Sequence, residues 1–120
     1  MEFVKGVKSG YGFEETVKRL KDASERRGWR VVNTLDMRES GVVIVEICKK
    51  ELAKEVLKDE ANCWVSAMMP CRLAVCKQSD GVFVYTMNME LFANMIGGKI
   101  GEILSGVAEE EKEILSSINS

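Results

Sequence analysis

The run from Val42 to Cys48 constrains the fold of this chain more than any other segment. It reads Val-Val-Ile-Val-Glu-Ile-Cys, with Gly41 before it and Lys49 after it. Seven residues that are mostly β-branched and almost all apolar suit a strand and are too few for a typical helix. Because polar residues do not alternate along the run, we expect a central strand that is covered on both faces.

Four other segments carry the apolar spacing of amphipathic helices. They are residues 13–27, 50–58, 89–96 and 99–117. Further strands are expected at residues 3–7, 29–35, 72–77 and 82–87. Turn sequences at residues 38–41 and 79–81 predict two antiparallel hairpins. Residues 61–70 could form either a short strand or a turn that packs on the core. Pro70 limits Met69 to extended geometry and does not decide between these two structures.

The predicted order is β-α-β-β-α-β-β-α-α, in one domain over residues 1–120. This order predicts the α+β class and a two-layer α/β sandwich, with about five strands and helices mainly on one face. We expect a mixed sheet, because the helix at residues 50–58 resembles the crossover that joins parallel strands.

The last helix carries a longer apolar stripe than a two-layer core of this size needs. A homodimer is therefore expected, in which the stripe meets a second copy and Gly101 allows close approach. The residues of that stripe are Ile100, Ile103, Val107 and Ile114.

Composition excludes several classes of protein. The chain has 17 Lys and Arg against 19 Asp and Glu, interspersed rather than gathered, so no nucleic-acid partner is expected. No apolar run approaches the roughly 20 residues of a membrane span, and the first residues do not read as a secretion signal. We therefore expect a cytoplasmic protein without a membrane partner. The absence of histidine removes Ser–His and Cys–His catalytic pairs and every His-ligated metal site.

The four cysteines, at positions 48, 63, 71 and 76, include no C-x-x-C pair. Lys49 follows Cys48, and Arg72 follows Cys71, and nearby cations lower the pKa of a thiol. Both cysteines can equally be small buried hydrophobes. If the helix at residues 50–58 joins two parallel strands, Cys48 and Cys71 would lie at opposite ends of the sheet. They would meet only if residues 61–69 carried the chain back first, or if dimer symmetry brought them together.

If the thiols are functional, they form a redox pair or bind a soft metal. Cys48 would then be the more reactive, because a helix begins beside it. Met87, Met89 and Met95 could form a thioether metal site but are expected to pack in the core or an interface, and the sequence does not identify a cofactor. Asn88 is either the N-cap of the following helix or a ligand-binding amide. The acidic run Glu109–Glu111, together with Glu113, is expected to be a solvated helix face.

Several residues together resemble the family labelled "domain of unknown function 302". The resemblance covers roughly residues 10–95 and rests on Phe13-Glu14-Glu15-Thr16-Val17, Leu20, Gly28-Trp29, Cys48, Ala53, Leu57, Met69-Pro70-Cys71, Gly81 and Asn88. Lys49-Lys50 departs from it, since the family often has Asn-Pro there. The resemblance implies a small, usually dimeric α/β domain with no assigned activity, and supplies no catalytic residues.

Two functions from different classes follow. One is a non-enzymatic, dimeric module that binds a small ligand or partner in a groove between the sheet end and the C-terminal helices. The other is a thiol-dependent redox or soft-metal-handling protein that uses Cys48 and Cys71. The candidate binding residues are Cys48, Lys49, Cys71, Arg72 and Asn88.

Overall fold

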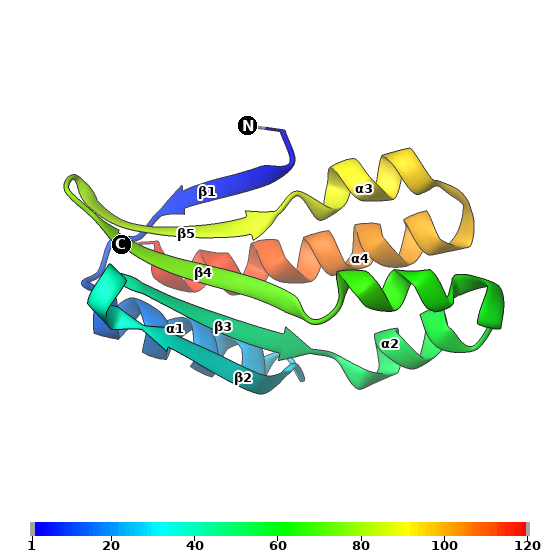
Figure 1. Ribbon diagram of the computed structural model, residues 1–120, viewed down its shortest axis with the longest axis horizontal. Coiled ribbons are helices and arrows are strands. Elements are labelled where there is room, and N and C mark those ends of the chain that lie inside the picture. The colour runs from blue at the N-terminus through cyan, green and yellow to red at the C-terminus, as the bar shows by residue number, and fades with distance from the viewer. Residues whose placement is uncertain (1, 120) are drawn as a thin grey trace.

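A computed structural model describes residues 2–119 as one five-stranded sheet with helices packed on one face (Figure 1). The strands lie in the order β1-β5-β4-β3-β2. Their bounds are β1 Val4–Lys8, β2 Arg30–Met37, β3 Val42–Cys48, β4 Cys71–Gln78 and β5 Gly81–Met87. The α+β class, the five strands and the two hairpins are confirmed.

The helices fall into two groups. The first and last long helices lie against the same face of the sheet, whereas the others extend beyond one end of it (Figure 1). Their bounds are α1 Phe13–Arg26, α2 Lys50–Leu57, α3 Met89–Ile96 and α4 Gly98–Leu115. Short 3-10 helices are η1 Arg38–Ser40, η2 Glu60–Met68 and η3 Ser116–Ile118.

The expectation of a mixed sheet is wrong, because every strand pair is antiparallel. The segment left open in the sequence accounts for the difference: η2 carries the chain back past α2 before β4 begins. The Asp59 side chain accepts a hydrogen bond from the Ala61 amide and so caps η2. As a result Ile47 of β3 pairs with Cys71 of β4, and Cys48 and Cys71 lie at the same end of the sheet.

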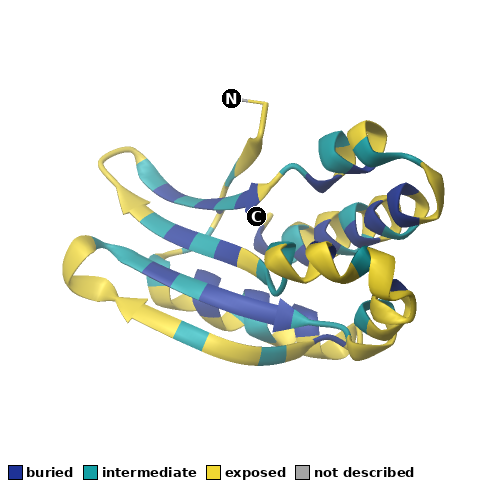
Figure 2. Cartoon of the chain, turned by 45° about the vertical axis from the view of Figure 1, so that its right-hand side comes forward, coloured by how far each residue is buried: buried dark blue, intermediate teal, exposed yellow. Residues whose placement is uncertain are grey.

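The core lies between the sheet and the helices. Val43, Val75 and Val84 lie opposite one another on three neighbouring strands, and each is fully buried. The alternate positions Ile44 and Tyr85 are only half-buried, since no helix covers that face (Figure 2). β3 is therefore covered on one face, not on both as its composition suggested.

The apolar stripe of α4 packs within its own chain. Ile100, Val107 and Ile114 are all buried in the core. A Cβ at Gly101 would lie 2.6 Å from the carbonyl oxygen of Ala93, so this glycine allows α3 to approach α4. The stripe is thus used inside the monomer and gives no reason for a second copy.

Candidate functional site: a groove beside α4 and an adjacent thiol cavity

The buried side of α4 includes a carboxylate. Leu104, Val107, Glu111 and Ile114 follow helical spacing, and all four face the core. Glu111 is only 5% exposed. A charged residue at such a position costs free energy unless it is paired or functional.

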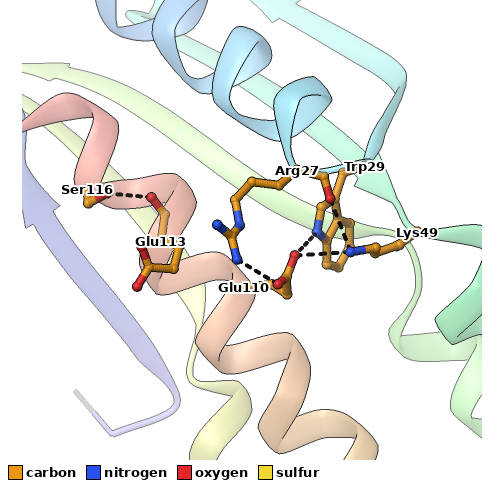
Figure 3. Close-up of polar contacts among 6 residues, drawn as sticks. All are labelled: Arg27, Trp29, Lys49, Glu110, Glu113 and Ser116. Atoms are coloured by element: carbon orange, nitrogen blue, oxygen red, sulfur yellow. Dashed lines mark hydrogen bonds and ion pairs between the residues drawn. The ribbon is translucent and has the colours of Figure 1, made fainter.

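The neighbouring Glu110 is held in a polar cluster (Figure 3). Its carboxylate accepts hydrogen bonds from Arg27 at 2.8 Å and from the indole N–H of Trp29 at 3.0 Å. The ammonium of Lys49 donates to it at 3.2 Å. The bonds from Arg27 and then Trp29 and Lys49 lower the pKa of Glu110 to about 2. The solvated-face interpretation of the acidic run is therefore wrong for Glu110 and Glu111, although Glu109 is exposed.

Glu111 has different surroundings. Burial raises its pKa to about 7, opposed in part by a hydrogen bond from the Cys71 thiol and by attraction to Lys5. No side chain of residues 2–119 forms an ion pair with it. A carboxyl poised near neutral pH inside a fold is a recurrent property of binding and catalytic sites.

Glu111 lines a groove of about 390 Å³ between the edge strand β1 and α4. This volume is within the range of small-molecule sites, ~300–1,000 Å³. The groove mixes charged, polar and apolar walls, formed by Lys5, Val7, Thr86, Met87, Asn88, Met89, Glu90, Ala108, Glu109, Glu111, Lys112, Leu115, Ser116 and Asn119. The ligand groove expected between the sheet end and the C-terminal helices stays a prediction, and the groove found here is lined by the edge strand β1 and by α4.

The two predicted thiols lie elsewhere, on a small apolar cavity of about 50 Å³. Cys48 and Cys71 both line it, with Trp29 and Met68 among the other walls. Burial, followed by the nearby Glu111 and Cys48, raises the pKa of the Cys71 thiol to about 12. Because a reactive thiol needs a lowered pKa, Cys71 is poorly suited to act as a thiolate.

The other candidate residues are divided among three places. Lys49 lines the thiol cavity and bonds to Glu110, as well as to the carbonyl oxygen of Arg27 at 3.1 Å. Arg72 points to the open face of the sheet and donates to Glu46 at 2.8 Å. Asn88 lines the groove, but the Oδ1 atom of its side chain accepts a hydrogen bond from the backbone N–H of Leu91. Asn88 therefore caps α3.

No group of three or more His, Cys, Asp and Glu side chains that could hold a metal ion occurs within residues 2–119. Over the same part of the chain, no helix is long and apolar enough to cross a membrane.

Sequence reasoning missed Glu111, Lys5 and Lys112 as site residues. The available signal was the position of Glu111, four residues after Val107 and three before Ile114, on the apolar side of α4. Reading the acidic residues as one exposed run concealed it. The lysines gave no signal, because they line one groove only when β1 and α4 are placed side by side.

Comparison with known proteins identifies the family but no activity. No curated protein matches the chain. Three solved chains match. One of them is the crystal structure of an uncharacterized conserved protein DUF302 from Bacillus stearothermophilus, which is 21% identical, with a TM-score of 0.85 over 99% of this chain and 100% of that one. The family described as domain of unknown function DUF302 matches residues 5–118, and this chain belongs to it.

Proposed function

We propose that this protein is a non-enzymatic module that binds a small ligand in the groove between β1 and α4. The observation that carries the proposal is the buried carboxyl of Glu111 on the wall of a groove of about 390 Å³. Small-molecule sites combine apolar walls with a few convergent polar groups, and the groove has this composition.

The groove suits a ligand better than the thiol cavity does. A volume of about 50 Å³ holds a few atoms at most, well below that of a small-molecule site. The walls of the thiol cavity are also almost entirely apolar, which leaves few groups to orient a ligand.

The proposal is tested by an NMR screen of ¹⁵N-labelled protein against a panel of small polar metabolites. Compounds that bind should shift the amide signals of Lys5, Thr86 and Lys112 together. The Ala108→Phe variant fills the groove and should abolish these shifts, whereas Ala61→Phe, at an exposed position on η2, should retain them. A panel that leaves the groove signals unmoved, or shifts that persist in Ala108→Phe, would contradict the proposal.

We further propose that the working unit is a homodimer, formed through the open face of the sheet. That face carries half-buried or exposed apolar residues on adjoining strands: Leu35, Val42, Ile44, Ala74, Phe83 and Tyr85. Five strands about 4.8 Å apart, with about seven residues rising ~3.3 Å each, give a plan area on the order of 550 Å². A standard interface buries ~800 Å² per partner, so this face could supply a large part of one.

A thiol pair is the second candidate, favoured by one observation: Cys48 and Cys71 line the same cavity. In this alternative the two thiols give two protons and two electrons to a small disulfide such as oxidised glutathione, which leaves as two thiols, while Cys48 and Cys71 join. Mass spectrometry after such treatment distinguishes the candidates. A Cys48–Cys71 bond that forms in folded protein supports the thiol function, and unmodified Cys48 and Cys71 contradict it.

A further inference from the structure

Of the two buried glutamates among residues 2–119, only Glu46 forms an ion pair. Glu46 is 7% exposed and bonds to Arg72 at 2.8 Å and to the Asn33 amide at 3.0 Å. Glu111 is 5% exposed and lies near the uncharged thiol of Cys71, which lines the same hollow. A buried carboxylate is expected to be paired, and Lys5 attracts Glu111 without forming an ion pair with it, so Glu111 lacks a directly bonded cation among residues 2–119.

The missing partner has room to bind on the groove side. Glu111 lines both the groove and a second hollow of about 270 Å³ that reaches Cys71 and Pro70. A small cationic group placed in the groove would therefore meet the carboxylate. The site is not built for a metal ion, because no third acidic or thiol ligand joins Glu111 and Cys71 among residues 2–119.

The mouth of the groove carries two lysines. Lys5 of β1 and Lys112 of α4 line it, are exposed, and form no ion pair within the described part of the chain. Glu90 and Glu109 also lie on the rim and are exposed, as the two lysines are, so the rim carries charges of both signs. The groove thus combines one buried carboxylate with two exposed ammonium groups that form no ion pair among residues 2–119.

We infer that the ligand of this groove is a small zwitterion, whose ammonium group meets Glu111 and whose carboxylate lies between Lys5 and Lys112. This inference rests on the proposed binding function and names the chemical class of the ligand. A simple anion would satisfy the lysines and leave Glu111 unpaired. A neutral apolar molecule would leave all three charges unsatisfied and would remove water from Glu111.

Three matched four-carbon probes test the inference: 4-aminobutyrate, n-butylamine and butyrate, titrated into ¹⁵N-labelled protein at pH 8. We expect 4-aminobutyrate to bind more tightly than either singly charged probe. Glu111→Gln keeps the shape of the side chain and removes its charge, and should weaken 4-aminobutyrate binding at least about tenfold. Glu113→Gln lies on the exposed side of the same helix and should leave the affinity unchanged.

Butyrate that binds as tightly as 4-aminobutyrate, with no effect of Glu111→Gln, would overturn the inference and leave an anion site formed by the lysines. Failure of all three probes to shift the groove signals would also overturn it. The proposed binding function falls only if the wider metabolite panel leaves those signals unmoved as well, so the two failures can be told apart.

Discussion

Glu110 and Glu111 are sequence neighbours whose carboxyl groups have opposite surroundings. Glu110 accepts three hydrogen bonds, from Arg27 just after α1, Trp29 just before β2 and Lys49 just before α2, and its pKa is lowered to about 2. Glu111 points inward, where burial raises its pKa to about 7. Side chains of adjacent residues point about 100° apart around a helix. Glu110 can therefore face the polar cluster while Glu111 faces the core.

Glu111→Gln is expected to stabilise the protein at alkaline pH. A carboxyl whose folded pKa is raised contributes stability below its ordinary pKa of 4.5, and that contribution is lost as the pH rises through about 7. At pH 8 the variant should unfold with a free energy up to about 3 kcal/mol higher than the parent. Near pH 4.5 the two should be alike, which urea denaturation at both values checks. Glu109→Gln, at an exposed position, should show no such pH-dependent difference.

Glu110→Gln should have the opposite effect on stability. The charge of Glu110 is paired with Arg27 and Lys49, so we expect the free energy of unfolding to fall by about 1–2 kcal/mol at pH 7, after allowance for solvent screening. A lowered folded pKa contributes stability that is lost as the pH falls through about 2. The difference from the parent should therefore shrink at pH 3, and equal stabilities at pH 7 would contradict this role.

At the scale of elements, α3 and α4 depend on one glycine contact. A Cβ at Gly101 would come within 2.6 Å of the Ala93 carbonyl oxygen, so Gly101→Ala should push the two helices apart and cost about 1–3 kcal/mol. Gly106 is a matched control on the same helix, with no atom within 4 Å of its added Cβ. Gly106→Ala should instead raise stability by about 0.5–1 kcal/mol, because alanine favours a helix. Thermal unfolding compares the two, and similar melting temperatures for both variants would disprove the close contact.

The elements were predictable where their signal is local. Apolar spacing and turn residues located the long helices and both hairpins, because these depend on neighbours within a few positions. The direction of β4 was not predictable, since it depends on how α2 and η2 together reverse the chain, and residues 60–68 carry no clear periodicity. The same reversal places Cys71 beside Glu111, so that contact could not be read from the sequence either.

At the scale of the whole molecule, the two faces of the sheet are unequal. One face is sealed by α1 and α4, and its central residues are fully buried. The other presents Ile44, Ala74 and Tyr85 side by side with no helix over them. The ring of Tyr85 covers Gly6 on the neighbouring strand, where an added Cβ would lie 2.7 Å from it. An apolar sheet face of this kind is stable when another layer packs on it.

The homodimer proposal predicts that the protein sediments at twice its chain mass of 13.4 kDa at tens of micromolar. Ala74→Lys places a charge at the centre of the open face, where two copies would bury it without a partner. An unpaired buried charge costs roughly 3–5 kcal/mol, so dimerisation should weaken by about a hundredfold or more, with little loss of monomer stability. Ala61→Lys, on the exposed surface of η2, should stay dimeric. A parent that sediments as a single chain, or an Ala74→Lys variant that still dimerises, would contradict assembly through this face.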